Sequence, residues 1–334
     1  MANYYFGIDV SKKTLDVALL KEGTIVSSHV IENNQKVIQN FFEPYSQQFQ
    51  LAGDEAWVCM EHTGIYNYRL LDVLEKLKFK ISLEPALQII KSQGMTRGKS
   101  DVIDAKRIAQ YAYKNREELK IWKPQRLTLQ KIKALLSQRN RLVKVKYQLE
   151  TPIQECAGFL DSQIVKTLKS STKATLKAIE KDLKKLEAQI DELVYLDKKL
   201  SNQFERATSV TGIGPITALN MIIASGEFEQ IKKPKQFACH AGVAPFEHTS
   251  GTSVKGRTRV SKMADHSLKK LLHMAALSAI QCEGEMKAYY SRKVNEGKNR
   301  MSVINAVRNK LINRVFVCIN QDRNYKKDYH QALA

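Results

Sequence analysis

Polar and apolar residues alternate along the first part of the chain. Three segments rich in β-branched and aromatic residues, 4–9, 14–20 and 24–31, are separated by the turn-forming residues 11–13 and 22–23. Alternation with a period of two is typical of strands that bury one face. The pattern therefore predicts a meander of three antiparallel strands.

Helical and strand-like periods alternate in the next part of the chain. Helical spacing is present at 36–49 and 68–77, and short apolar runs are present at 57–60 and 81–83, the second ending before Pro85. A meander followed by alternating helices and strands predicts a mixed sheet flanked by helices, the order found in ribonuclease H-like domains. The predicted class of this part is α/β.

From residue 127 onward the apolar period becomes that of long helices. Leu135, Leu142 and Leu149 recur every seven residues, and the segment 176–193 follows a three-four spacing. Pro152 and the 157–158 region fall between the two segments, which favours an antiparallel coiled-coil hairpin over a single rod. Such a hairpin could be a dimerisation arm or an ordinary helical subdomain, and the sequence leaves both open.

The last part of the chain predicts a mainly α-helical domain. A glycine turn at 211–215 leads into an apolar helix, a segment at 248–262 rich in small, hydroxyl and basic residues predicts a loop, and 268–280 and 303–319 have helical periodicity. A chain of 334 residues exceeds the usual size of one core. We expect one domain at 1–124, a helical connector at 125–205 and a C-terminal domain at 206–334.

The chain is strongly basic, with 54 Lys and Arg against 34 Asp and Glu and a net charge of +20. Such an excess most simply neutralises phosphates, so nucleic acid is the expected partner, and a generally basic surface is the alternative. The 5 scattered cysteines contain no Cys-x-x-Cys pair, which argues against a disulfide framework and a zinc ribbon. Without a secretory signal pattern or an apolar run of ~18 residues, we expect a soluble cytoplasmic protein with no membrane partner.

Four acidic residues occupy positions that a folded domain can bring together. Asp9 and Glu61 end two predicted strands, and Asp101 and Asp104 share one face of a predicted helix start. Converging carboxylates repel one another unless divalent cations hold them, and Mg²⁺ favours such all-oxygen sites. Each acid taken singly could be structural, for instance beside a helix cap at Ser100. The combination predicts a two-metal site suited to phosphodiester cleavage.

Basic residues and glycines predict where nucleic acid binds. The 211–215 turn is similar to the glycine hairpin of helix-hairpin-helix modules, whose backbone amides meet DNA phosphates, although a plain tight turn would have the same sequence. The expected nucleic-acid contacts near the acids and in this turn are Lys12, Arg97, Lys99, Lys106, Arg107, Gly212 and Gly214.

The segment 248–262 combines a hydroxyl group with glycine and cations. Ser250 is a candidate nucleophile, which would need activation, and His248 is near it in the sequence. Glycine lets the backbone approach a phosphate, and cations neutralise its oxygens. A phosphate-binding loop without covalent chemistry is the alternative, and Ser253 or Ser261 would be equally eligible. The expected contacts here are Gly251, Lys255, Arg257, Arg259 and Lys262.

Five motifs occur in one order over nearly the whole chain. They are Gly7-Ile8-Asp9-Val10-Ser11-Lys12, Glu61-His62-Thr63-Gly64, Lys99-Ser100-Asp101-x-x-Asp104-Ala105, Thr211-Gly-Ile-Gly-Pro215, and Ala241-Gly-Val-Ala-Pro245 with Ser250-Gly251. Together they strongly resemble the DEDD transposases, the Piv-like recombinases of the insertion-sequence one-ten family. The resemblance implies a RuvC-like N-terminal domain, a coiled-coil connector and a C-terminal transposase domain.

The resemblance also implies site residues and a reaction. Asp9, Glu61, Asp101 and Asp104 would form an acidic tetrad that holds Mg²⁺, and Ser250 would attack a DNA phosphodiester to give a covalent phosphoserine link. Rejoining would need no nucleotide cofactor, because the phosphodiester-like linkage persists. The family commonly has a glycine after the Ser-Lys pair that follows the basic loop, whereas 261–265 has alanine and aspartate there.

The partners implied by the resemblance are donor DNA, target DNA, a structured bridge RNA that pairs with both, and a homodimer that assembles to a tetramer in association with a prokaryotic nucleoid. Two other functions stay open from the residues themselves. One is a RuvC-like metal nuclease that cleaves with water and never becomes attached to DNA. The other is a basic nucleic-acid binder whose acids are structural.

Overall fold

The computed structural model describes residues 4–52, 55–92, 100–244, 246–250, 254–261 and 263–326; of 246–250 and 254–259 it describes only the backbone. The chain divides into two compact units, Met1–Pro124 and Gln125–Ala334. No helix in these described ranges combines the length and apolarity of a membrane span.

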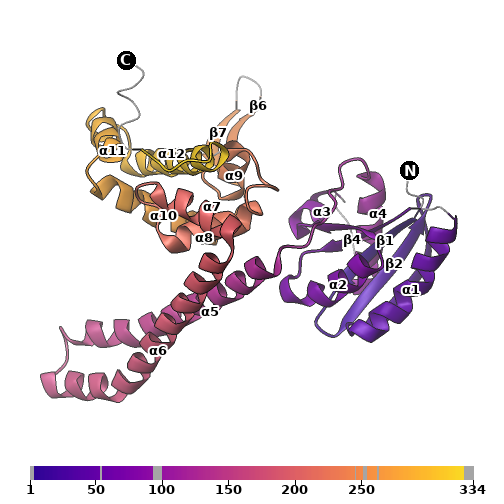
Figure 1. Ribbon diagram of the computed structural model, residues 1–334, viewed down its shortest axis with the longest axis horizontal. Helices are drawn as coiled ribbons and strands as arrows, with labels where there is room; N and C mark the ends of the chain where they lie inside the picture. The colour runs from indigo at the N-terminus through magenta and orange to yellow at the C-terminus, as the bar shows by residue number, and fades with distance from the viewer. Residues whose placement is uncertain are drawn as a thin grey trace. The chain divides into compact units, whose positions relative to one another are not determined.

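The first unit is built on a five-stranded mixed sheet (Figure 1). Its spatial order is β3-β2-β1-β4-β5; β1, β2 and β3 pair antiparallel, and β1, β4 and β5 are parallel. The predicted meander and mixed sheet are confirmed, as is the ribonuclease H-like order. The strands are β1 (Tyr4–Val10), β2 (Thr14–Lys21), β3 (Thr24–Glu32), β4 (Ala56–Glu61) and β5 (Lys80–Glu84).

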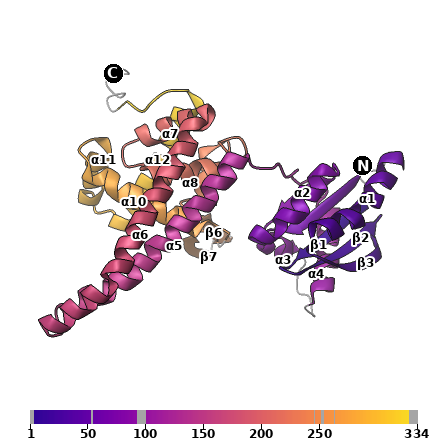
Figure 2. The same cartoon turned by 60° about the horizontal axis from the view of Figure 1, so that its bottom comes forward.

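Helices cover both faces of this sheet, because both sets of alternating side chains along its central strands are apolar (Figures 1 and 2). Phe6, Ile8 and Val10 pack with α1 and α2, whereas Tyr5 and Ala18 lie on the opposite face with α4. The helical elements of this unit are α1 (Gln35–Ala52), η1 (Gly64–Asn67), α2 (Tyr68–Lys76), α3 (Ala86–Ser92) and α4 (Asp101–Lys114).

Gly7 in β1 sets how closely α4 approaches the sheet. A Cβ atom on Gly7 would lie 2.1 Å from the backbone nitrogen of Ala109 and 2.3 Å from the carbonyl oxygen of Ala105. Real Cβ atoms essentially never approach other atoms so closely. Only glycine therefore lets the α4 backbone lie directly on β1.

The second unit begins with a long antiparallel pair, α5 (Leu127–Cys156) and α6 (Ser162–Leu196), joined by a short connection (Figure 2). Arg139 of α5 pairs with Glu187 of α6 at 2.8 Å, and Lys146 of α5 pairs with Glu180 of α6 at 2.7 Å, so the two helices run in opposite directions. Pro152 lies inside α5 and not between the helices, where we had placed it.

One end of this pair enters the core of the C-terminal helices. Leu129 and Ile132 from α5 and Ile190 and Val194 from α6 are buried in one apolar cluster with residues of the later helices. Those helices are α7 (Lys198–Ser209), α8 (Pro215–Ser225), α9 (Pro234–His240), α10 (His266–Gln281), α11 (Glu285–Asn295) and α12 (Arg300–Asn320).

The prediction of a basic loop at 248–262 is wrong in part, because the chain there forms a two-stranded antiparallel hairpin of β6 (Phe246–Ser250) and β7 (Val254–Arg259). The glycines and cations suggested a loop, but valine and threonine alternate with them, and β-branched residues favour strands. Ala264 and Asp265, which stand where the family commonly has a glycine, directly precede helix α10. Asp265 caps α10, accepting hydrogen bonds from the backbone nitrogens of Ser267 at 2.8 Å and Leu268 at 3.0 Å.

Candidate active site

Two of the predicted acids end neighbouring parallel strands. Residue 8 of β1 pairs with residue 60 of β4, so Asp9 and Glu61 follow at the same edge of the sheet. Both are an even number of residues from apolar side chains on the α4 face, Tyr5 and Cys59. The strand pairing therefore places the two carboxylates on the face that α4 covers.

The first turn of α4 supplies the other two acids. Ser100 caps this helix, and its Oγ accepts a hydrogen bond from the backbone nitrogen of Ile103 at 3.4 Å. Asp101 and Asp104 follow in the first turn, as the sequence predicted. An Arg107 nitrogen lies 3.0 Å from Oδ1 of Asp104, so this predicted DNA contact also pairs within the acidic cluster.

The four carboxylates interact electrostatically. Burial first, and then the charges of Asp101, Asp104 and Glu61, together raise the pKa of Asp9 to about 6. The pKa of Glu61 is raised by burial and by Asp104. The two strand ends and the helix start thus share one region of negative potential.

Two further carboxylates on this face were missed from the sequence. Asp16 in β2 lies opposite Asp9 and is 6% exposed, and burial together with the charge of Asp101 raises its pKa. Glu84 ends β5 opposite Glu61 and accepts a hydrogen bond from Ser82 Oγ at 2.6 Å. A hairpin that turns at 11–13 places residue 16 opposite residue 9, so the strand register could have indicated from the sequence that Asp16 lies beside Asp9. The position of Glu84 could be known only from the pairing of β4 with β5.

A buried asparagine holds the turn that follows Glu61. Asn67 is 1% exposed, and its Nδ2 donates a hydrogen bond to the Glu61 carbonyl oxygen at 2.9 Å. Its Oδ1 accepts hydrogen bonds from the backbone nitrogen of Thr63 at 2.7 Å and from Thr63 Oγ1 at 2.9 Å. The chain direction beyond Glu61 is thereby determined by one side chain.

The donor set fits a hard divalent cation. All candidate ligands are carboxylates, and their mutual repulsion is of the kind that a cation relieves. Within the described ranges, no three His, Cys, Asp or Glu side chains are already close enough to hold one ion.

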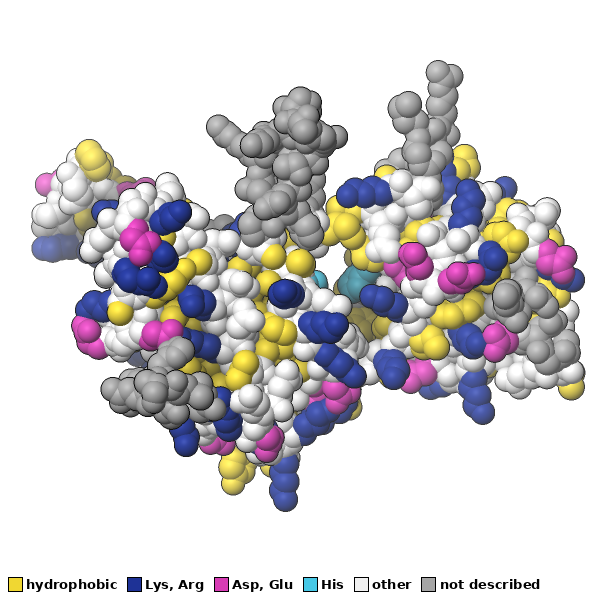
Figure 3. Space-filling view, turned by 90° about the horizontal axis from the view of Figure 1, so that it is seen from above, with side chains coloured by type: hydrophobic (Ala, Val, Ile, Leu, Met, Phe, Trp, Pro, Cys, Tyr) yellow, Lys and Arg dark blue, Asp and Glu magenta, His cyan; other side chains and the backbone are white. Residues whose placement is uncertain are grey.

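The remaining predicted contacts have different placements. Lys12 is exposed in the β1–β2 turn, and Lys106 is half-buried in α4. Lys255, Arg257 and Arg259 belong to β7. On the face shown in Figure 3, Lys and Arg side chains are spread over both units and form no single patch. Arg97, Lys99, Gly251, Ser253 and Lys262 lie outside the described residues.

The glycine turn between α7 and α8 has one half-buried glycine, packed against α10, and one exposed glycine. Gly212 has a φ of +96°, and a Cβ there would lie 2.6 Å from Cβ of Ala279, so this glycine is needed for packing on α10. Gly214 precedes α8, is exposed, and has no atom within 4 Å of a built Cβ. Of the two predicted phosphate contacts, Gly214 has the open approach.

Ser250 is the last residue of β6 and pairs with residue 254 of β7. The segment that leads into this hairpin is tied to two helices. Asn305 of α12 donates a hydrogen bond from Nδ2 to the Val243 carbonyl oxygen at 2.8 Å, and the backbone nitrogen of Asp265 donates to the His240 carbonyl oxygen at 2.8 Å. The hairpin with Ser250 therefore extends from an anchored base.

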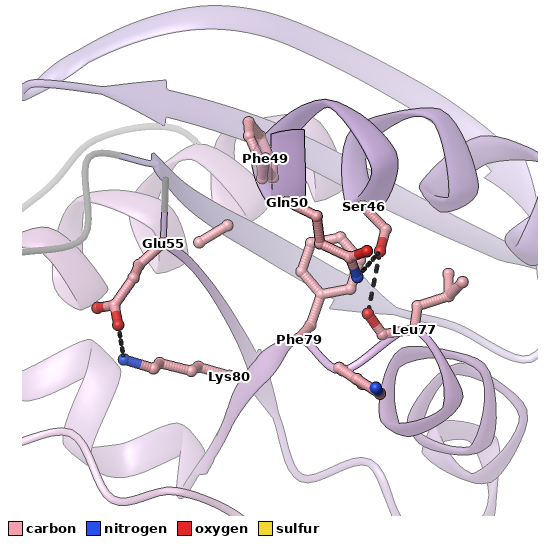
Figure 4. Close-up of a pocket in the computed structure, with 9 residues that line it drawn as sticks. Ser46, Phe49, Gln50, Glu55, Leu77, Phe79 and Lys80 are labelled. Carbon is pink, nitrogen blue, oxygen red and sulfur yellow. Dashed lines mark hydrogen bonds and ion pairs between the residues drawn. The ribbon is translucent and has the colours of Figure 1, made fainter. Parts of the chain in front are cut away.

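A pocket of about 230 Å³ lies at the opposite edge of the sheet from the acids, where β4 and β5 begin (Figure 4). Two of its charged groups pair with each other, since Lys80 Nζ lies 2.6 Å from Glu55 Oε1, and Lys78 also lines it. Ser46 donates a hydrogen bond to the Leu77 carbonyl oxygen at 3.0 Å. Because it lies where β4 and β5 begin and the acids lie near the other ends of the strands, this pocket is not part of the acidic site.

Two family models of transposases match this chain, one in its N-terminal part and one in its C-terminal part. A model described as "Transposase", of the DEDD type of IS110, matches residues 6–158, and a model described as "Transposase IS116/IS110/IS902 family" matches residues 205–291. The pilin gene-inverting protein of Moraxella bovis is 27% identical over 99% of this chain and 100% of its own length. The transposase of insertion sequence element IS1111A from Coxiella burnetii is 24% identical over 68% of each chain.

Among solved structures, RuvC of T. thermophilus in complex with a Holliday junction substrate has 10% identity and a TM-score of 0.26, covering 34% of this chain and 95% of that one. This likeness is too distant to support the assignment, which rests on the family models and the relatives. They confirm the resemblance found in the motifs. The chain belongs to the IS116/IS110/IS902 family of transposases, enzymes that cleave and rejoin DNA.

Proposed function

We propose that this transposase cuts DNA with Mg²⁺ held by Asp9, Glu61, Asp101 and Asp104, and that Ser250 becomes covalently attached to the cut strand. The DEDD domain implies the use of a divalent metal, and Mg²⁺ is the proposed ion. The observation that carries the proposal is the strand pairing that places Asp9 and Glu61 on the face covered by α4, whose first turn holds Asp101 and Asp104; burial and the charges of these acids accordingly raise the pKa of Asp9 to about 6. Such a concentration of buried negative charge favours a bound cation.

The proposed reaction exchanges one phosphoester for another. The Ser250 hydroxyl oxygen bonds to the phosphorus, the bond from phosphorus to the 3′ oxygen breaks, and the serine proton passes to a base as the 3′ oxygen leaves. When bound, Mg²⁺ would supply charge stabilisation at the phosphate and at the departing oxygen. A 3′ hydroxyl of a new strand can then attack the phosphoserine and release the serine, so no nucleotide is consumed.

The test is a denaturing gel of protein with labelled DNA in the presence of Mg²⁺. Ser250→Ala should abolish the protein–DNA adduct, and the matched change Ser261→Ala should retain it. An adduct that persists in Ser250→Ala would show that the nucleophile is another group. Mg²⁺-dependent cleavage without an adduct in any protein would favour the alternative, a RuvC-like nuclease that uses water.

The proposed DNA contacts are tested separately from the chemistry. The cations of β7, Lys255, Arg257 and Arg259, together with Lys12 and Lys106, are proposed to bind phosphates, as is the open turn at Gly214. Each lost phosphate contact should reduce the slope of log affinity against log salt by about 0.9 on duplex DNA. If a substitution leaves this slope unchanged, the replaced residue makes no phosphate contact in the native protein.

We further propose that a structured bridge RNA directs the enzyme to donor and target DNA, and that the α5–α6 pair serves as a coiled-coil arm in a homodimer that assembles to a tetramer. The net charge of +20 supports a large nucleic-acid interface. Sequencing of RNA that copurifies with the protein tests the guide, and the mass of the complex with and without RNA tests the assembly. Full activity after removal of RNA would contradict guidance.

A further inference from the structure

The loops that follow Asp9 and Glu61 are joined by one buried side chain. Asn33 is 5% exposed, and its Nδ2 donates hydrogen bonds to the Ser11 carbonyl oxygen at 2.9 Å and to the Tyr66 carbonyl oxygen at 3.1 Å. The β1–β2 turn and η1 are therefore neighbours in space. They continue the strands that carry the two acids.

Large apolar and aromatic side chains on this joined surface are exposed. Ile65 is 72% exposed, Tyr66 37% and Tyr68 45%. Asn67, between the two tyrosines in sequence, is instead buried and holds the turn. The exposed side chains thus project from a fixed backbone.

Exposed cations lie in the same joined elements. Lys12 and Lys13 are exposed in the β1–β2 turn, and the backbone nitrogen of Asn33 donates a hydrogen bond to the Lys13 carbonyl oxygen at 2.8 Å. Arg69 is exposed at the start of α2, and its Nη1 donates to the Asn33 carbonyl oxygen at 2.7 Å. We call the six residues Lys12, Lys13, Ile65, Tyr66, Tyr68 and Arg69 the aromatic–basic surface.

We infer that the aromatic–basic surface binds unpaired bases of the DNA strand that enters the acidic site. Aromatic side chains interleaved with cations are the chemistry that binds single-stranded nucleic acid, with bases stacked on the rings and phosphates neutralised by the cations. The acidic residues themselves repel phosphates in the absence of metal, so this neighbouring surface supplies the attraction. The inference rests on the proposed function for the identity of the strand.

The inference also predicts a preference for opened DNA. In a duplex both faces of each base are already stacked, so a tyrosine ring has access only to a base that has left the stack. A strand held at Tyr66 would then be unpaired beside the cleavage site. Binding to a single strand, or to a duplex with a mismatch bubble, should exceed binding to the matched duplex.

The first experiment locates the contact without requiring catalysis. The full-length protein is mixed in EDTA with single-stranded DNA containing 5-iododeoxyuridine, irradiated and digested, and the cross-linked peptide is identified by mass spectrometry. A cross-link within 61–69 supports the inference. Cross-links confined to other segments, or formed by an iodinated RNA of the same sequence and not by the DNA, would overturn it.

The second experiment measures affinity for the same strand at several salt concentrations. Tyr66→Ala should weaken binding by about tenfold with little change in salt slope, because a stacked base carries no released counterion. Lys12→Gln should reduce the slope by about 0.7. Tyr66→Phe should bind as the native protein does, and the matched change Tyr195→Ala, at a tyrosine that is 81% exposed on α6, should have no effect.

A second variant and two further results separate this inference from its alternatives. If Tyr66→Ala fails to fold, Tyr68→Ala carries the same prediction. If both variants bind DNA normally but change the mass of the protein in solution, a second copy covers the surface and the inference is wrong. If no adduct depended on Ser250, the proposed covalent step would be refuted, and the cross-link and affinity results would still decide this inference on their own.

Discussion

Gly7→Ala is predicted to damage the acidic site without altering any acid. The added Cβ would lie 2.1 Å from the Ala109 nitrogen, and ordinary contact begins at 3.4 Å, so α4 must retreat by about 1 Å. Overpacking costs roughly 1–3 kcal/mol, and we expect the upper end because backbone atoms cannot rotate aside. For a domain of this size, that corresponds to a fall in Tm of roughly 10 °C.

The same displacement moves the start of α4, with Asp101 and Asp104, away from the strand ends. Mg²⁺ demands near-ideal coordination, and a misplacement of about 1 Å can cost on the order of 100-fold in rate. We therefore expect Gly7→Ala to reduce both DNA cleavage and the stabilisation produced by added Mg²⁺. Thermal unfolding followed by circular dichroism, with EDTA and with Mg²⁺, measures the two effects.

Controls isolate the cause. Gly158→Ala introduces the same methyl group where a built Cβ meets nothing within 4 Å, so its stability should stay within about 0.5 kcal/mol of the native protein. Adding Ala109→Gly to Gly7→Ala should give no recovery, because the contacts are with backbone atoms. A Gly7→Ala protein with native Tm and a native response to Mg²⁺ would refute the close packing of α4 on β1.

Three further predictions concern stability. Because the pKa of Asp9 is raised, the folded state binds more protons than the unfolded state between pH 3.8 and about 6. The free energy of unfolding of the metal-free protein should therefore fall by on the order of 1 kcal/mol as pH rises through that window. Asp9→Asn should remove this fall in melts recorded across the window, and identical pH profiles of the native protein and the variant would contradict the prediction. Asn67→Ala should cost about 2–3 kcal/mol in urea unfolding and weaken the Mg²⁺ response, because it removes three hydrogen bonds beside Glu61; an unchanged midpoint would count against it. Arg126→Ala leaves the Glu227 carboxylate, 8% exposed, without the guanidinium that donates to both of its oxygens, and should cost about 3 kcal/mol in the second unit; a loss below about 0.5 kcal/mol would show that the pair is not needed.

Much of the first unit could be predicted from its sequence. The meander, the strands that carry Asp9 and Glu61 near their ends, and the helix that starts after Ser100 were predicted correctly, and the parallel pairing of those two strands came from the structure. Each depends on an apolar period, a turn or a cap that acts over a few residues. The β6–β7 hairpin was missed because its glycines and cations resemble those of a loop.

From the sequence alone come four candidate acids, the elements that carry them, and the basic character of the chain. The folded structure was needed to show that Asp16 and Glu84 lie on the same face, that Gly7 lets α4 approach β1, and that Asn33 joins the loops beyond the acids. Local patterns are encoded by neighbours along the chain, whereas contacts between residues far apart depend on strand register and on how closely backbones pack. Those depend on the whole fold.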